Sequence, residues 1–217
     1  MFNVETHLNA PFFIHLIMNL TYLALGDSYT IGEQLPVYDS FPYQAMQLLR
    51  SKGIHCAAPE MVAKTGFSTD ELLAQIEQTI FLPTYDVVSL LIGVNNQYRG
   101  RNTTDFEPEF SLLLQKAIDF AGGNPKKVMV LSIPDWGTTP FAEGRNRESI
   151  ATEIDGYNNS CKIITAMMGC CYIDITHSQR MDGVDEQFLA TDKLHPSRKE
   201  YAKWAALLAA EIESRIK

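Results

Sequence analysis

Short apolar runs alternate along the chain with longer segments in which apolar residues recur at helical spacing. This alternation favours βαβ units, in which parallel strands are joined by helices that cross over the sheet. Three of the runs are nearly continuous, as expected for strands covered by helices on both faces. The sequence therefore predicts an α/β fold, a three-layer α/β/α sandwich. We expect strands at 20–25, 54–63, 86–93, 127–133 and 170–175, and helices at 40–52, 69–81, 104–121, 146–168 and 197–216.

Two of the predicted helices begin with a capping signal. Ser68 and Ser197 each precede an apolar-periodic run and are followed three residues later by a glutamate, Glu71 and Glu200. In a capping box, the serine and the glutamate side chains satisfy backbone N–H groups at the helix start. The pattern predicts such a box at both helices.

The composition is that of an ordinary globular protein. Of the 217 residues, 46% are hydrophobic and 20% charged, and neither a repeat nor a linker divides the chain. We therefore expect a single domain over residues 18–217, preceded by an apolar arm at 1–17. The apolar segment 11–18 is too short for a membrane span, which needs about 20 residues. We expect the arm to dock on its own body or on a second subunit, which makes a homodimer one alternative.

Charge and cysteine content limit the partners and the compartment. The formal net charge of −8 disfavours non-specific binding to nucleic acid or to an anionic membrane. The four cysteines, at 56, 161, 170 and 171, form no CxxC pair, so we expect buried, reduced thiols in a cytoplasmic protein. A periplasmic or secreted protein is the alternative. The chain contains no GxGxxG, GxxxxGK[ST] or HExxH motif, and we expect neither a cofactor nor a metal.

The segment GDSYT places Ser28 directly after the first predicted strand. A serine at this point can cap a helix or act as a nucleophile, and a nucleophilic serine needs a base. His195, in DKLHPS, is the best candidate, because Asp192 can bind its Nδ1 and leave Nε2 free to face a hydroxyl. Taken alone, the Asp-x-x-His pattern also fits ordinary turn residues before the last helix.

Two further residues follow predicted strands and can offer N–H donors to a negative charge. Gly66 lies in a turn after the second strand, where its backbone can be approached closely, and Asn95 lies just after the third. Each is also an ordinary turn residue. In a parallel sheet, Ser28, Gly66 and Asn95 would meet at one edge, and His195 precedes the last helix. That all four residues fall at such positions by chance is much less probable than that any one of them does.

Two long loops follow strands, at 96–109 and 134–147. Ligands of open parallel sheets bind beyond the carboxyl ends of the strands, where these loops lie. The candidate pocket residues are Tyr98, Arg99, Arg101, Trp136 and Phe141. The alternative for each of them is an ordinary role as a solvated loop residue or in local packing.

The segments GDSYT, KTGFST, GVNN and DKLHPS together resemble the four blocks of the SGNH hydrolases, also called the GDSL esterase/lipase family. The resemblance extends from about residue 20 to 216. It implies a flavodoxin-like fold with a five-stranded parallel sheet in the order 2-1-3-4-5. It also implies Ser28 as nucleophile, His195 as base and Asp192 as its orienting carboxylate, with an oxyanion hole formed by Ser28, Gly66 and Asn95. The family usually has a structural aspartate where this chain has Asn96.

The resemblance predicts a cofactor-free serine esterase or lipase that cleaves a small-molecule ester through an acyl-enzyme on Ser28. A carbohydrate esterase that removes acetyl groups is one alternative, and lipid or thioester substrates are others. A catalytically silent binding module on the same scaffold is the alternative outside the enzymes. The GxSxG elbow of the α/β-hydrolases is absent.

Overall fold

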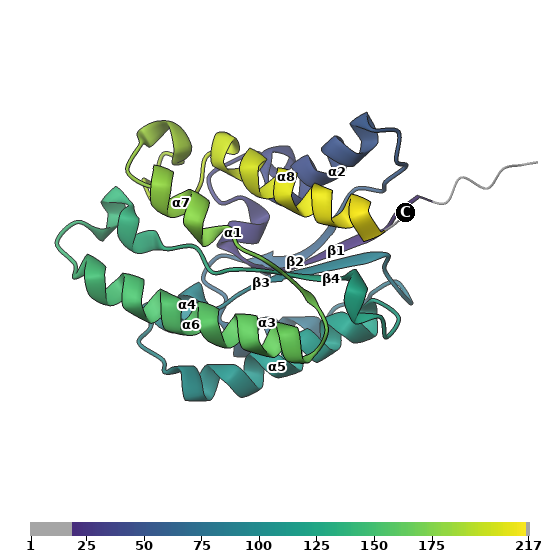
Figure 1. Cartoon of the computed structure of the whole chain (residues 1–217), viewed down its shortest axis with the longest axis horizontal. Helices are drawn as coiled ribbons and strands as arrows, with labels where there is room; N and C mark the ends of the chain where they lie inside the picture. Colours follow the sequence, from purple (N-terminus) through teal and green to yellow (C-terminus); the bar gives the residue numbers. More distant parts are fainter. Residues whose placement is uncertain (1–18, 216–217) are drawn as a thin grey trace, which may run out of the picture.

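The computed structural model describes residues 19–215, which fold around a five-stranded parallel sheet (Figure 1). The strand order is β2-β1-β3-β4-β5, and every neighbouring pair is parallel. The predicted fold class and strand order are therefore confirmed. The strands are β1 (Tyr22–Asp27), β2 (Glu60–Lys64), β3 (Val87–Leu91), β4 (Val128–Leu131) and β5 (Cys171–Ile173).

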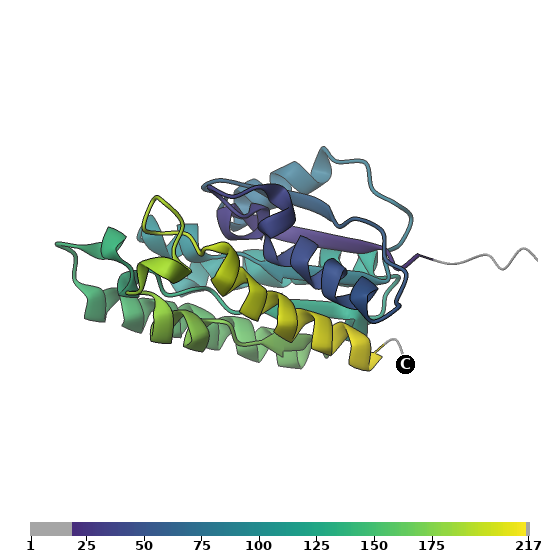
Figure 2. The ribbon, with the colours of Figure 1, turned by 90° about the horizontal axis from the view of Figure 1, so that it is seen from above.

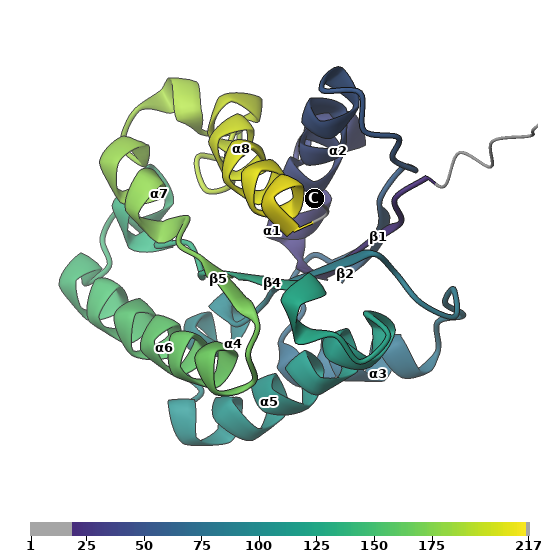
Figure 3. The same ribbon diagram turned by 45° about the vertical axis from the view of Figure 1, so that its right-hand side comes forward.

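Helices cover both faces of this sheet. They are α1 (Ser28–Ile31), α2 (Phe41–Ser51), α3 (Thr69–Glu77), α4 (Val94–Tyr98), α5 (Thr103–Phe120), α6 (Arg147–Met167), α7 (Thr176–Asp182) and α8 (Arg198–Arg215). One layer contains α1, α2, α7 and α8, and the opposite layer contains α3 to α6 (Figures 1 and 3). Each strand is joined to the next by a crossover through one of these layers, as parallel pairing requires.

The core lies between the sheet and these two helical layers. Every residue of β1, β3 and β4 is buried, because helices cover these strands on both faces. On one side α2 and α8 run next to each other (Figure 2) and supply Phe41 and Trp204. On the other side α5 supplies Phe106 and Phe110. Burial of these large apolar side chains is the main term that stabilises the fold.

The observed elements differ from the predicted ones mainly at their ends. The second strand was expected at 54–63 but pairs with β1 only from Glu60, after Pro59, while Cys56 forms an isolated bridge with Leu20. The helix predicted at 69–81 ends at Glu77. The helices α1, α4 and α7 were not predicted, because elements of 4, 5 and 7 residues are too short to show a helical period.

Only one of the two predicted capping boxes forms. At the start of α3, the carboxylate of Glu71 accepts the backbone N–H of Ser68 at 2.9 Å. The box predicted at Ser197 is wrong, because Glu200 turns into the interior. Its Oε1 accepts the Ser178 hydroxyl at 2.6 Å and the Trp204 indole N–H at 3.0 Å.

The apolar arm predicted at residues 1–17 lies outside the described residues, and a homodimer formed through it stays a prediction. Between residues 19 and 215, no helix is both long enough and apolar enough to cross a membrane. The four cysteines are free thiols. Burial raises the pKa of Cys161 far above its usual range and that of Cys170 to about 11.

Candidate active site

The strand register brings three of the predicted site segments to one edge of the sheet. Gly26 of β1 lies opposite Ala63 of β2 and Leu91 of β3. The three strands consequently end almost level, and the residues that follow them are neighbours. Ser28 and the segments that begin at Thr65 and Ile92 thus leave the sheet side by side.

Ser28 is the first residue of α1, and Asp27 is the residue that caps this helix. The Oδ1 atom of Asp27 accepts the backbone N–H of Tyr29 at 3.0 Å. The capping role considered for Ser28 is therefore filled by its neighbour. The Ser28 hydroxyl is left to make another contact.

That contact is with His195, the histidine expected as the base. The Nε2 atom of His195 lies 2.9 Å from the Ser28 Oγ, and its Nδ1 lies 2.6 Å from the Oδ2 of Asp192. The other carboxylate oxygen of Asp192 accepts the backbone N–H groups of Leu194 and His195, both at 3.0 Å. Asp192 is thereby fixed by its own turn, and it orients the imidazole so that Nε2 faces the hydroxyl.

The surroundings keep Asp192 ionised and His195 in place. Burial works against the Asp192 carboxylate, but hydrogen bonds from the ring and backbone of His195 and from Leu194 hold its pKa below the usual range. His195 is 6% exposed and Ser28 5%. The Tyr29 ring packs against the imidazole, with centroids 4.9 Å apart. A negative charge is thus held beside one imidazole nitrogen, where it can stabilise an imidazolium ion.

Asp27, by contrast, is a buried carboxyl with an incomplete set of partners. Burial raises its pKa to about 7, although the hydrogen bond from the Tyr29 N–H opposes this rise. Among residues 19–215, its Oδ2 has no hydrogen-bond partner. The carboxyl next to the serine therefore changes its charge near neutral pH.

Gly66 and Asn95 lie beside Ser28 and offer N–H donors. Within the described part of the chain, no hydrogen bond engages the backbone N–H of Gly66. The amide nitrogen of Asn95 donates one hydrogen to the Phe67 carbonyl at 2.9 Å. An amide nitrogen has two hydrogens, so this bond orients Asn95 and leaves the second hydrogen available.

The turn that carries Asn95 depends on Gly93. This residue has a φ of +127°, and a Cβ at this position would lie 2.6 Å from the Cδ1 of Ile133. Only glycine fits there. Asn96, the departure from the family pattern, is fully buried and makes two bonds with Thr69. Its oxygen accepts the Thr69 N–H at 3.1 Å, and its nitrogen donates to the Thr69 hydroxyl at 2.6 Å.

A cavity of about 210 Å³ opens over these groups. It is lined by Ser28, Tyr29, Thr65, Gly66, Val94, Asn95, Tyr98, Trp136, Phe141, Leu194 and His195. The structure thus brings together Tyr98, Trp136 and Phe141, which were expected from the two loops. Arg99 and Arg101, expected with them, are not among the lining residues, because they form ion pairs with Glu71 and Asp70 at the start of α3.

Two residues that shape this cavity were not expected from the sequence. Gln97 accepts the indole N–H of Trp136 at 2.8 Å and so fixes the ring. The Arg145 guanidinium lies 5.1 Å from the centroid of the Tyr98 ring, 5.3 Å from that of Trp136 and 5.9 Å from that of Phe141. Arg145 belongs to the long loop 134–147, but nothing in that loop's sequence distinguishes it from its polar neighbours.

Another cavity, of about 410 Å³, lies at the opposite edge of the sheet, where the strands begin. Its lining includes Leu20, His55, Val87 and Lys127 but neither serine nor cysteine. Among residues 19–215, no group of three His, Cys, Asp or Glu side chains could hold a metal ion. The groups suited to acyl chemistry therefore converge at the carboxyl edge.

A parallel α/β sheet with a serine, a histidine and an aspartate in a hydrogen-bonded line at its carboxyl edge is an arrangement typical of serine hydrolases. The chain belongs to the GDSL-like lipase/acylhydrolase family, whose model matches residues 24–203. The family membership predicted from the four sequence blocks is thereby confirmed. A comparison with curated protein sequences found no significant match.

Solved structures of similar fold cover nearly the whole chain. A lipase/acylhydrolase from Enterococcus faecalis is 22% identical, with a TM-score of 0.68 over 90% of this chain and 96% of that one. TesA is 16% identical, with a TM-score of 0.69 over 89% and 98%. Axe2, an acetylxylan esterase from Geobacillus stearothermophilus, is 18% identical, with a TM-score of 0.67 over 90% and 95%. At these identities the likeness concerns the fold.

Proposed function

We propose that the protein is a serine esterase that hydrolyses carboxylic esters through an acyl-enzyme on Ser28. The single observation that carries the proposal is the line of contacts from the Ser28 hydroxyl through His195 to Asp192. A serine hydroxyl is a weak nucleophile unless a base stands ready to take its proton. The contact between His195 Nε2 and the Ser28 hydroxyl supports His195 as this base, and family membership supports the reaction class.

In the first half of the reaction, Ser28 Oγ attacks the ester carbonyl carbon and its proton passes to His195 Nε2. The tetrahedral intermediate then collapses, and the imidazolium returns this proton to the departing alkoxide, which leaves as an alcohol. In the second half, His195 takes a proton from water as the water attacks the acyl-enzyme. The second tetrahedral intermediate then collapses. The carboxylic acid leaves, and His195 returns its proton to the Ser28 oxygen, which restores the hydroxyl.

Negative charge on the carbonyl oxygen needs preorganised donors in both halves. We assign this role to the N–H groups of Ser28 and Gly66 and to the side-chain amide of Asn95. Two features support the assignment: the Gly66 N–H makes no hydrogen bond among residues 19–215, and Phe67 fixes the Asn95 amide. Donors fixed before the reaction favour the transition state because they need little reorganisation when the charge develops.

The size and lining of the cavity favour a short or single-ring acyl group. A cavity of about 150 Å³ is enough for a benzene-sized molecule, and the cavity beside Ser28 measures about 210 Å³. Ligand pockets more often span about 300–1,000 Å³. A long fatty acyl chain would therefore extend past Phe141 into solvent.

Removal of acetyl groups from a carbohydrate is the second candidate. Tyr98 and Phe141 are 45% and 41% exposed at the mouth of the cavity, where they could stack on a sugar. Axe2, whose fold is similar, is an acetylxylan esterase. The small cavity fits an acetyl group equally well in a simple ester and in an acetylated sugar.

The test is a series of p-nitrophenyl esters from acetate to palmitate, with acetylated xylan measured beside it. We expect kcat/KM to be highest for the shortest esters and the Ser28→Ala variant to be inactive. Faster release of acetate from xylan than from p-nitrophenyl acetate would favour the carbohydrate esterase. Absence of turnover on every substrate would support the catalytically silent binding module.

A further inference from the structure

The turn that carries Gly66 is closed by a backbone hydrogen bond from the Phe67 N–H to the Lys64 carbonyl at 3.2 Å. It spans Thr65 to Ser68, between β2 and α3, and Gly66 has a φ of +83°. A Cβ at this position would meet only the Nη2 of Arg99, at 3.8 Å, so glycine is needed for its backbone angle and not for space. Glycine gives the backbone its greatest conformational freedom. The hydrogen bond that closes the turn engages neither the N–H nor the carbonyl of Gly66, so contacts from outside the turn must help to fix the direction of the Gly66 N–H.

Arg99 supplies the principal contact of this kind. Its Nη2 donates to the Gly66 carbonyl at 2.7 Å, and its Nη1 donates to the Ser68 hydroxyl at 3.2 Å and to Glu71 at 3.0 Å. Glu71 in turn accepts the backbone N–H of Ser68. One planar guanidinium thus joins the glycine carbonyl to the capping box at the start of α3.

Arg99 ends the same short helix that carries Asn95. The two residues are four positions apart, so their side chains leave α4 on one face. Asn95 binds the Phe67 carbonyl and Arg99 binds the preceding carbonyl, that of Gly66. The consecutive peptide groups Gly66–Phe67 and Phe67–Ser68 are therefore held by one helix. The Gly66 N–H belongs to the peptide group just before them, Thr65–Gly66, which meets the first held group at the Gly66 Cα.

We propose that Arg99 is a positioning residue for the oxyanion hole. It does not line the cavity beside Ser28 and acts through Gly66, whose N–H it keeps directed at the carbonyl oxygen of the ester. This inference rests on the proposed esterase function. Because the donor matters most when the oxygen becomes negatively charged, loss of Arg99 should lower kcat and leave KM nearly unchanged.

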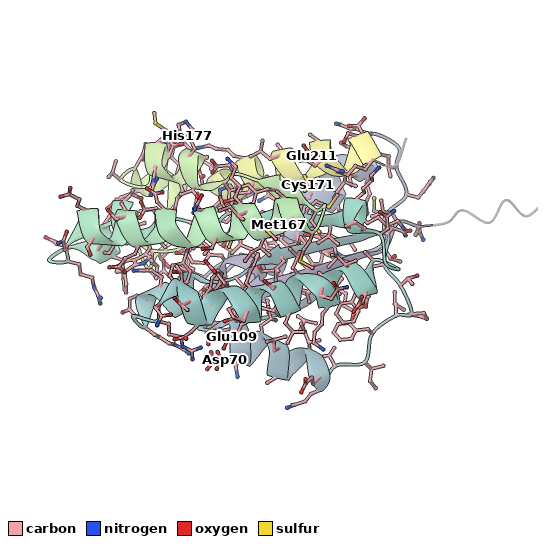
Figure 4. All side chains as sticks on the ribbon, turned by 60° about the horizontal axis from the view of Figure 1, so that its bottom comes forward. Asp70, Glu109, Met167, Cys171, His177 and Glu211 are labelled. Atoms are coloured by element: carbon pink, nitrogen blue, oxygen red, sulfur yellow. The ribbon has the colours of Figure 1, made fainter. Side chains whose placement is uncertain are left out.

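Arg101 provides a matched control. It pairs with Asp70 at 2.7 Å and lies 3.9 Å from Glu109, and these two acidic residues lie together beside α3 and α5 (Figure 4). The side chains of Arg99 and Arg101 are 39% and 33% exposed. Both therefore form partly exposed ion pairs near the start of α3, which add little to stability. Only Arg99 binds Gly66.

The experiment compares Arg99→Gln, Arg99→Lys and Arg101→Gln by kinetics on p-nitrophenyl acetate, by Tm and by the NMR order parameter of the Gly66 amide in ¹⁵N-labelled protein. We expect Arg99→Gln to lower kcat by about 10-fold to 100-fold with KM changed less than about threefold. The order parameter of its Gly66 amide should fall below that of the wild type. A lysine side chain can reach the Gly66 carbonyl but cannot bind Ser68 and Glu71 at the same time. The kcat of Arg99→Lys should therefore lie between those of wild type and Arg99→Gln.

Arg101→Gln should keep kcat within about twofold of wild type. An equal loss of kcat in Arg99→Gln and Arg101→Gln would overturn the proposal. An unchanged order parameter of the Gly66 amide in Arg99→Gln would overturn it too. If Arg99→Gln fails to fold, Arg99→Lys decides by the same two readouts. A wild-type protein that hydrolyses no ester would overturn the proposed function, and the order parameter of the Gly66 amide would then still decide whether Arg99 holds the turn.

Discussion

His195 Nε2 lies 2.9 Å from the Oγ of Ser28, although 167 positions separate the two residues in the sequence. The contact joins the end of β1 to the loop before α8, so it exists only when these two distant parts of the chain have come together in the fold. Asp192, by contrast, is bound to His195 within a single turn. We therefore expect loss of the long-range contact, Ser28–His195, and loss of the local one, Asp192–His195, to have different effects on activity.

We expect His195→Ala to lose more activity than Asp192→Ala. The first variant removes the base, whereas the second leaves an imidazole that has lost its orienting charge. Neither side chain fills the core, so both variants should keep the wild-type circular dichroism spectrum. The measurement is kcat/KM on one activated ester, with Ser28→Ala beside them. An Asp192→Ala variant as active as wild type would reduce the site to a Ser28–His195 dyad.

Asn95→Ala and Asn96→Ala should affect different properties. Asn95 is expected to bind the oxyanion, so its loss should lower kcat by about 100-fold or more with little change in KM. Asn96 is buried and makes both of its hydrogen bonds with Thr69. Its loss should lower the free energy of unfolding by roughly 1–3 kcal/mol and affect kcat far less. The opposite pattern would exchange the roles of the two asparagines.

Asp27 should make the protein less stable as the pH rises from about 4 to about 7. Burial raises its pKa from 3.8 to about 7, so over this range the folded protein holds a proton that the unfolded chain has released. The contribution lost is on the order of 4 kcal/mol at most. Asp192 acts in the opposite sense, because its pKa is lower in the folded protein than in the unfolded chain. It stabilises the fold at pH values above its pKa in the unfolded chain, and this stabilisation is lost as the pH falls.

The Asp27→Asn variant isolates the first effect, because asparagine can still cap α1 and carries no charge. Tm is measured for both proteins at pH 5 and pH 8. The Tm of the variant relative to that of wild type should be higher at pH 8 than at pH 5, since every other titrating group is common to both proteins. An identical difference in Tm at the two pH values would mean that Asp27 ionises in the folded state near its ordinary pKa.

Arg145 should limit the length of the acyl group. Its guanidinium covers the rings of Tyr98, Trp136 and Phe141, and it donates to the Tyr98 hydroxyl at 3.1 Å. Arg145→Ala should raise kcat/KM for the octanoate ester relative to acetate by about 10-fold. The control is Arg147→Ala, since the Arg147 guanidinium binds the Gly137 carbonyl and, among residues 19–215, stands over none of these three rings. An unchanged ratio in Arg145→Ala would show that the guanidinium does not restrict the cavity.

Much of the site could be predicted from the sequence because its parts are encoded locally. Ser28 and Asn95 follow buried strands, and Asp192 and His195 share one turn. Parallel pairing then places the strand ends at one edge whatever the loops do. The sheet order itself came from the resemblance to the family and not from the periodicity.

The remaining contacts join residues of different loops and elements, which no local pattern reveals. Gln97 meets Trp136 across 39 positions, and Arg99 meets Gly66 across 33. Arg99 was expected in the pocket but is not among its lining residues. Its guanidinium binds Glu71 and the Gly66 carbonyl at the start of α3 instead. Charge pairing of this kind depends on which side chains the folded loops bring within reach.

The most direct test of the account is the site of covalent labelling by a fluorophosphonate. The reagent reacts with a serine whose proton is taken by a neighbouring base, so it reports the nucleophile itself. Digestion and mass spectrometry should find a single adduct, on the peptide that contains Ser28, and no adduct in the Ser28→Ala variant. An adduct on Ser68, or an active enzyme that carries none, would contradict the assignment of Ser28.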